Sequence, residues 1–378
     1  MTAKPAPSGP PAPLDGVRVL EVGGIGPVPF AGMLLAEMGA DVVRIDRPDP
    51  ERVLPGEIID DLLSRGKRSI TLDLKQADEL EVLLALTGRA DVLLEGFRPG
   101  VAERLGFGPD ACHERNAALV FGRMTGWGQE GPLAQRAGHD LNYIGLTGAL
   151  HAIGAAGGPP QVPLNVIGDF GGGAMYLVVG VLAGLWDARA TGHGRVVDAA
   201  IVDGTAHLLA SVHSLMNAGA WRDERGTNLL DGGAPFYAVY ETADERYMAV
   251  AAIEARFYRN LVATLAVPLD PAAQNDRDTW PRAREVLAGA FRRRTRPAWT
   301  EAFADVDACV SPVLSLQEAV RDPHLLGRAT LRADGGRVEA AAAPRFGLGD
   351  PPPGLRPPPR LGVHRADVVA DWLGRVPT

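Results

Sequence analysis

Short apolar strand patterns and amphipathic helix patterns alternate over the first 125 residues, and this alternation most constrains the fold. Strands are expected at 17–22, 41–45, 69–72, 90–94 and 119–124, with helices at 30–38 and 78–87. Strand–helix–strand units at this spacing predict an α/β fold with a parallel sheet covered by helices. In such sheets, ligands bind at loops that leave the carboxyl ends of strands. That rule directs attention to Arg47, to residues 96–98 and to residues 125–128.

The rest of the chain has a different pattern. Residues 234–252 alternate like paired strands, and helical spacing then continues to about 310. A Pro-rich stretch covers 344–359. At 378 residues the chain is also too long for one simple core. We therefore predict a second, smaller domain over about 225–325.

The charge balance argues against two classes of partner. The chain has 38 basic and 46 acidic residues, a net charge of −8. Binders of nucleic acid or anionic membranes need a basic surface, so neither partner is expected. The apolar run 170–186 contains five glycines and is shorter than the roughly 20 residues of a membrane span. It is predicted to be a buried helix in a soluble protein.

Cysteine usage indicates a reducing compartment. Cys112 and Cys309 are the only cysteines, and no Cys/His cluster has metal-ligand spacing. Neither a disulfide framework nor a structural metal is therefore expected. Residues 1–13 are rich in Pro and Ala and have no apolar core, so they are not expected to be a signal peptide. A cytoplasmic location is expected.

A glycine-rich loop follows the first strand, as in dinucleotide-binding folds. Gly24 and Gly26 match two glycines of that fingerprint, but Pro29 stands where the third is required. A tight strand-to-helix turn explains the loop better, so a nicotinamide cofactor is not expected.

Four basic residues lie at or just after expected strand or helix ends. They are Arg47, Lys75, Arg98 and Arg104. Arginine binds phosphate oxygens in bidentate fashion, so this placement suits a ligand with several phosphates. Each taken alone is an ordinary solvated charge, and the four do not name a ligand.

Three segments carry titratable side chains that are candidates for catalysis. His139 and Asp140 follow Gly138 in an apolar neighbourhood. Asp169 precedes a glycine run that opens an apolar helix, and Glu254 lies at the end of an expected strand. Each also has an ordinary explanation: a satisfied buried histidine, a helix N-cap aspartate and a surface glutamate. From the pattern alone, these residues are candidates without a mechanism.

Longer motifs carry a family resemblance. Segments that resemble the family III CoA-transferase superfamily are 14–21, 39–46, 67–70, 72–75 and 95–100. Segments that resemble the α-methylacyl-CoA racemases within it are RMTGWGQ (123–129), GHDLNY (138–143) and GDFGGG (168–173). Together these motifs are long and specific, and the resemblance runs from about residue 13 to residue 373.

The resemblance implies a role for each candidate residue. The two proton-transfer residues of the racemases match His139 and Asp169, and the glutamate that partners the histidine matches Glu254. The CoA-contacting positions match Arg47, Leu72, Asp73, Leu74, Lys75, Gly96, Phe97, Arg98, Arg104, Gly138, Leu141, Asn142 and Tyr143.

The resemblance also implies the fold, a Rossmann-like large domain made from both chain ends with a smaller α+β domain between them. The expected segments are the large CoA-binding domain at 1–200, a connecting helix or linker at 201–224, the small domain at 225–325, and a Pro-rich connector with a C-terminal return to the large domain at 326–378. Chains of this kind form an interlocked dimer, so a homodimer is expected.

The implied reaction removes a proton from C2 of a 2-methylacyl thioester and returns one on the opposite face. Two bases, His139 and Asp169, meet that need, and Glu254 would orient and charge-support His139. Backbone N–H groups near Asp140 would stabilise the enolate oxygen, so its backbone is expected to matter more than its side chain. CoA is part of the substrate, and no metal or cofactor is expected because the thioester itself acidifies the carbon.

Two other functions stay open. In a family III CoA-transferase an aspartate forms a covalent aspartyl-CoA thioester, and Asp140 matches that nucleophile. A transferase does not require His139, Asp169 and Glu254 as a set, which favours the racemase. A CoA-binding protein without activity would have no need for both bases.

Overall fold

The computed structural model describes residues 12–49, 61–334, 336–346 and 356–374. The predictions for 1–13 and for the Pro-rich stretch 344–359 therefore fall largely outside the described residues. The chain divides into two compact units. The large unit comprises Met1–Thr147, Leu164–Leu209 and Glu339–Thr378, and the small unit comprises Gly148–Pro163 and Ala210–Val338. The division assigns 148–163 to the small unit and 201–209 to the large unit, whereas the expected segments were a large domain at 1–200 and a linker at 201–224.

A six-stranded parallel sheet forms the centre of the large unit. Its strands are β1 (Arg18–Val22), β2 (Asp41–Asp46), β3 (Arg68–Thr71), β4 (Val92–Glu95), β5 (Val120–Thr125) and β6 (Val196–Ala200), in the order β3-β2-β1-β4-β5-β6. The winding direction reverses between β1 and β4, and ligands of such sheets bind at that switch point. The α/β prediction with a parallel sheet is confirmed. The sixth strand, β6, was not predicted.

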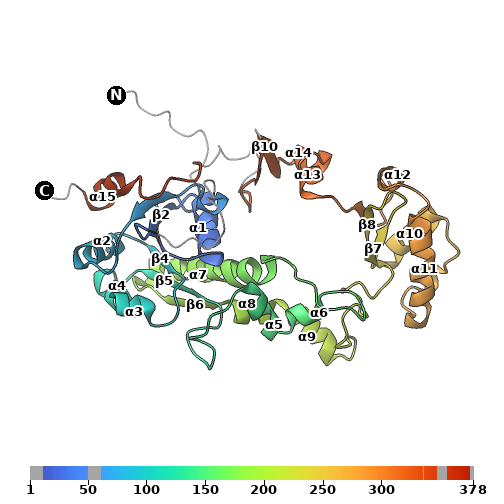
Figure 1. Cartoon of the computed structure of the whole chain (residues 1–378), viewed down its shortest axis with the longest axis horizontal. Coiled ribbons are helices and arrows are strands. Elements are labelled where there is room, and N and C mark those ends of the chain that lie inside the picture. The colour runs from blue at the N-terminus through green and yellow to red at the C-terminus, as the bar shows by residue number, and fades with distance from the viewer. Residues whose placement is uncertain (1–11, 50–60, 335, 347–355, 375–378) are drawn as a thin grey trace. The chain divides into compact units, whose positions relative to one another are not determined.

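Neighbouring residues of each strand bury into opposite faces of the sheet, as the strand period of two requires. Val19, Val42, Val92 and Val120 join one core, and Leu20, Val43, Leu93 and Phe121 join the other. The first core packs against α1 (Pro27–Glu37) and α7 (Met175–Thr191). The second packs against α2 (Ala77–Thr87), α4 (Pro109–Arg115) and α15 (Arg365–Leu373). Figure 1 shows these helices around the sheet.

The C-terminal helix α15 docks on β3 and α2, and this contact ties the two ends of the chain together. Val368 and Trp372 are buried in the second core. Arg365 forms a bidentate pair with Glu79, with N–O distances of 2.6 and 2.7 Å. The large unit is therefore built from both chain ends.

The small unit contains an antiparallel sheet of β7 (Tyr237–Glu241), β8 (Tyr247–Ala251) and β9 (Val310–Pro312). An aromatic core lies beneath it, in which Phe291 contacts Tyr240, Trp299 and Phe303. The accompanying helices are α6 (Ala149–Ala152), α9 (Ala210–Asn217), α10 (Ala255–Leu265), α11 (Trp280–Phe291), α12 (Arg296–Ala302), α13 (Leu316–Ala319) and α14 (Pro323–Gly327). A two-stranded sheet of β10 (Leu331–Asp334) and β11 (Arg337–Ala340) follows them.

The apolar run near residue 170 differs from the predicted buried helix. It forms a π-helix, Val166–Ala174, that continues into α7. By length and composition, Val166–Thr191 is apolar enough to cross a membrane, with a mean hydropathy of 1.7, and only 39% of that window is buried. Leu177 and Val181 face the core, whereas Val179 and Trp186 are exposed. The prediction was wrong about the outer face, because only one stripe of the helix contacts the sheet.

Candidate active site

Asp169 lies inside the π-helix, four residues after its N-cap Asn165, so the N-cap explanation for this aspartate is wrong. Asn165 instead donates from Nδ2 to Asp169 Oδ2 at 3.1 Å. A π-helix is rare and frequently marks a functional site. Burial raises the pKa of the Asp169 carboxyl, the Asn165 hydrogen bond lowers it, the Asp140 charge raises it, and His139 lowers it. These influences place Asp140, Asp169 and His139 in one electrostatic neighbourhood.

The Asp169 carboxylate lies directly against Gly26, the N-cap of α1. A Cβ at this position would stand 2.9 Å from Asp169 Oδ2, and the backbone φ is +64°, so only glycine suits it. Phe30 of α1 stacks on Phe170, with ring centroids 4.5 Å apart. The glycine loop that suggested a dinucleotide fingerprint therefore makes room for a carboxylate.

A buried ion pair holds the first turn of α1 in place. Lys67 Nζ lies 2.6 Å from Glu21 Oε2 and donates to the Pro29 carbonyl at 2.8 Å. A Cβ at Gly32 would lie 1.9 Å from Glu21 Oε2, so the helix rests directly on this carboxylate. Burial raises the pKa of Glu21 against the opposing charge of Lys67. The pair thus supports the helix that borders Asp169.

The Asp140 side chain is buried and faces the start of the π-helix. Its Oδ2 accepts the backbone N–H of Asp169 at 2.7 Å. A Cβ at Gly168 would lie 2.3 Å from the same oxygen, so Gly168 permits the approach. Burial raises the pKa of Asp140, and hydrogen bonds from the backbones of Asp169 and Gly168 lower it. The side chain of Asp140 therefore has a contact of its own with the backbone of Asp169, beside the predicted role of its backbone.

His139 is the N-cap of α5 (Asp140–Leu146) and is exposed, so the buried-histidine explanation is wrong. Its backbone N–H donates to Asn142 Oδ1 at 3.0 Å. Its carbonyl accepts the N–H groups of Asn142 and Tyr143 at 2.8 and 3.3 Å. The backbone is therefore fixed while the imidazole faces solvent.

Tyr143 closes the GHDLNY loop onto the loop after β5. Its hydroxyl donates to the Gly138 carbonyl, and its ring packs edge-on against Trp127 at 4.7 Å. A Cβ at Gly126 would lie 1.9 Å from the Tyr143 ring, so this close approach requires glycine. Burial raises the pKa of Tyr143, the Asp169 charge raises it further, and Arg98 opposes them. The 96–98, 126–128 and 138–143 loops therefore meet at the carboxyl edge of the sheet.

The residues with predicted CoA contacts are distributed along this edge. Arg47, Lys75 and Arg98 are exposed after β2, β3 and β4, and Arg104 is exposed on α3 (Val101–Leu105). Gly96 and Asp73 lie in the loops after β4 and β3, with Leu74 partly buried and Leu141 exposed on α5. Leu72 is an exception, because its side chain is buried in the second core.

The Phe97 ring lies against Gly23, where a Cβ would stand 3.0 Å from the ring, and packs edge-on against Phe107 at 6.0 Å.

Glu254 belongs to the small unit, where it is the exposed N-cap of α10. Its pairing with His139 stays a prediction. Sequence reasoning missed Asn165, the contact between Gly26 and Asp169, and the hydrogen bond between the Asp169 backbone and the Asp140 side chain, since all three depend on a π-helix that no sequence period predicts.

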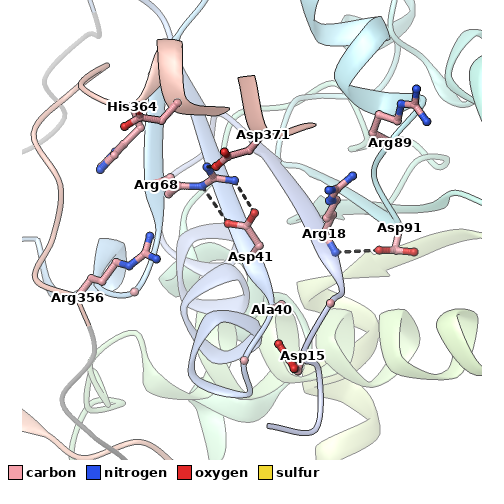
Figure 2. Close-up of a pocket in the computed structure, with 14 residues that line it drawn as sticks. Asp15, Arg18, Ala40, Asp41, Arg68, Arg89, Asp91, Arg356, His364 and Asp371 are labelled. Carbon is pink, nitrogen blue, oxygen red and sulfur yellow. Dashed lines mark hydrogen bonds and ion pairs between the residues drawn. The ribbon is translucent and has the colours of Figure 1, made fainter. Parts of the chain in front are cut away.

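A cavity of about 1030 Å³ lies elsewhere, at the amino ends of β1, β2 and β3. Arg18, Asp41, Arg68 and His364 line it, and Figure 2 shows Arg68 between two aspartates. None of the predicted site residues lines this cavity.

The chain belongs to the CoA-transferase family III, whose family model matches residues 14–365. It is 40% identical over 362 residues to alpha-methylacyl-CoA racemase of Mus musculus, covering 95% of this chain and 93% of that protein. It is 30% identical over 389 residues to succinyl-CoA–D-citramalate CoA-transferase of Chloroflexus aurantiacus, covering 97% and 95%. The fold is similar to the crystal structure of a CAIB/BAIF family protein from Brucella suis, with a TM-score of 0.82, 23% identity and coverage of 96% and 100%. The predicted family resemblance is confirmed.

Proposed function

We propose that this protein is a racemase that interconverts the 2R and 2S forms of 2-methylacyl-CoA thioesters by moving a proton at C2. The observation that carries the proposal is the hydrogen bond from the Asp169 backbone to the Asp140 carboxylate, which holds Asp169 at the start of the helix that His139 caps, in a chain 40% identical to a racemase over nearly its whole length. The predicted acyl-CoA chemistry is supported by the same relative and by the family.

The chemistry needs one group to remove the C2 proton and another to supply a proton on the opposite face. Asp169 is held by Asn165 and by the Asp140 carboxylate, so its position is fixed before substrate arrives. Burial raises its pKa, which brings a carboxyl closer to the pH at which it exchanges protons efficiently. His139 is exposed and serves as the opposite base, with Glu254 as its orienting partner.

The enolate oxygen requires hydrogen-bond donors in place before the proton leaves. The backbone N–H groups of Asp140 and Leu141, the first two of α5, serve this purpose, because the first turn of a helix leaves its N–H groups without partners in that helix. Arg47, Lys75, Arg98 and Arg104 supply positive charge for the CoA phosphates. The thioester acidifies C2 by itself, so the proposed reaction uses no metal or other cofactor.

The favoured alternative within the family is CoA transfer through Asp140. A nucleophilic carboxylate must be free to attack the thioester, whereas Asp140 is buried and bonded to the Asp169 backbone. The same contact has a direct use in a racemase, since it positions the second base. This geometry favours proton transfer over acyl transfer.

The active form is proposed to be an interlocked homodimer, soluble in the cytoplasm and bound to neither nucleic acid nor membrane. Met175, Val179 and Trp186 form an exposed apolar stripe on α7, and Val196 extends it onto the edge strand β6. Trp186 is 81% exposed, which is unusual for so large an apolar side chain. A second copy of the chain is the occupant consistent with the expected dimer. Trp186→Glu should then shift the mass measured by light scattering from dimer to monomer.

One incubation separates the functions. The protein is given a single epimer of a 2-methylacyl-CoA in D2O together with a free carboxylic acid, and C2 and the acyl group are followed by mass spectrometry. Deuterium at C2 with both epimers formed supports the racemase. CoA passing to the free acid without deuterium supports the transferase, and neither change identifies a binding protein.

A further inference from the structure

Arg123 of β5 connects two carboxylates from different elements. Its Nε donates to Glu95 Oε1 at 2.9 Å, and its two terminal nitrogens donate to Glu103 at 2.8 and 3.2 Å. Arg123 and Glu95 are buried and face each other across the register of β4 and β5. Arginine is suited to this place because its planar fork makes several hydrogen bonds in fixed directions.

The second oxygen of Glu95 reaches the loop that carries two predicted CoA contacts. Glu95 Oε2 accepts the backbone N–H of Phe97 at 2.7 Å. Burial raises the pKa of Glu95, and the Phe97 hydrogen bond and the Arg123 charge oppose that shift. One carboxylate therefore connects the guanidinium to the backbone next to Arg98.

The other end of the network is α3. Glu103 precedes Arg104 directly and lies in the same five-residue helix. A single buried guanidinium thus fixes both the loop that presents Arg98 and the helix that presents Arg104.

We infer that Glu95, Arg123 and Glu103 are positioning residues that preorganise Arg98 and Arg104 for the nucleotide part of the CoA thioester. The inference rests on the proposed function. Groups that are already held in place lose less freedom when a ligand binds, so the network favours binding. It touches neither reacting carbon nor base, so the proton transfer itself is unaffected.

The test compares two thioesters of the same acid, one of CoA and one of pantetheine, which lacks the nucleotide. Arg123→Lys keeps the charge and removes the fork, and we expect KM for the CoA thioester to rise about 10-fold with kcat within about 2-fold. Glu103→Gln, at the more exposed end, should raise KM about 3-fold. For the pantetheine thioester, kcat/KM should not change in either variant.

A merely structural role predicts equal losses for both thioesters, and that result would overturn the inference. Arg115→Lys is the matched control, because Arg115 makes an exposed bidentate pair with Glu81, which is not a predicted site residue. This variant should change KM and kcat for neither thioester. Circular dichroism and a thermal melt verify that each variant is folded.

Calorimetric binding of free CoA separates this inference from the proposed function. If the wild-type protein binds CoA without racemising, and Arg123→Lys weakens binding about 10-fold, the network stands and the racemase proposal falls. If the wild-type protein racemises and both variants bind CoA as the wild type does, the network inference falls alone.

Discussion

The two edges of the parallel sheet carry similar side chains and use them differently. At the amino edge, the charge of Arg68 is neutralised by Asp41 and Asp371, and Asp91 accepts a hydrogen bond from the backbone N–H of Arg18 (Figure 2). At the carboxyl edge, Asp169 is desolvated and receives only an amide hydrogen bond on its carboxylate, beside an exposed His139. The cavity of about 1030 Å³ belongs to the first edge. The comparison indicates that incomplete compensation of charge around Asp169, more than the size of a hollow, distinguishes the proposed site.

Asp169→Asn, at the carboxyl edge, should have the largest effect, and that effect should be on C2 exchange. The amide keeps the shape of the side chain but cannot take up a proton, so C2 exchange should fall by about 10³-fold or more. The measurement is deuterium incorporation from D2O into each epimer. Asp371→Asn at the amino edge is the matched control and should exchange at the wild-type rate. Equal rates in Asp169→Asn and wild type would remove Asp169 from the mechanism.

Asp140→Asn should have the next largest effect. It weakens the hydrogen bond to the Asp169 backbone, and we expect kcat to fall about 10- to 100-fold, from a loss of roughly 1.5–3 kcal/mol. It also removes a negative charge that raises the pKa of Asp169. Where Asp169 acts as the base, activity declines as pH falls through the pKa of Asp169. The acid limb of the pH–rate profile should therefore move to lower pH in the variant. An acid limb that stays at the same pH while kcat falls would contradict the electrostatic effect of Asp140 on Asp169.

Much of the carboxyl edge could be predicted from the sequence because it depends on local patterns. Strand periodicity located β1 to β5, and the parallel arrangement then placed residues 96–98 and 126–128 at the same edge. Motifs singled out His139 and Asp169 before any geometry was known. The amino edge drew no prediction, because its pairs join residues from different elements that are far apart in the sequence, up to 303 positions for Arg68 and Asp371.

The π-helix could not be predicted for a different reason. Helix periodicity assumes 3.6 residues per turn, whereas this segment follows a wider winding set by its packing. A Cβ at Gly172 would lie 2.4 Å from Thr205 Oγ1, and one at Gly204 would lie 1.8 Å from the Gly172 carbonyl. Gly172 of the GDFGGG motif is therefore required by α8 (Ile201–Leu208), a partner that the motif itself does not reveal.

Arg68→Gln should affect stability and spare catalysis. Arg68 is buried, and removing it leaves Asp41 without its ion pair, so the free energy of unfolding should fall by about 2 kcal/mol. This estimate is below that for a fully buried pair because the Asp41 side chain is 39% exposed. Urea unfolding measures the loss, and kcat per folded molecule should equal that of wild type. A large fall in kcat would show that the two edges are coupled.

Asp371→Asn should produce the smallest effect and separate the two partners of Arg68. The Asp371 side chain is 63% exposed and lies 2.7 Å from Arg68, so water screens this pair. We expect a loss of about 0.5 kcal/mol in the free energy of unfolding at low salt. The loss should vanish near 1 M salt, where the screening length is only about 3 Å. A loss as large as that of Arg68→Gln, unchanged by salt, would mean that Asp371 rather than Asp41 holds the C-terminal helix to the sheet. The charge balance at the amino edge would then depend on α15. The difference in charge compensation between the two edges would come from that helix alone.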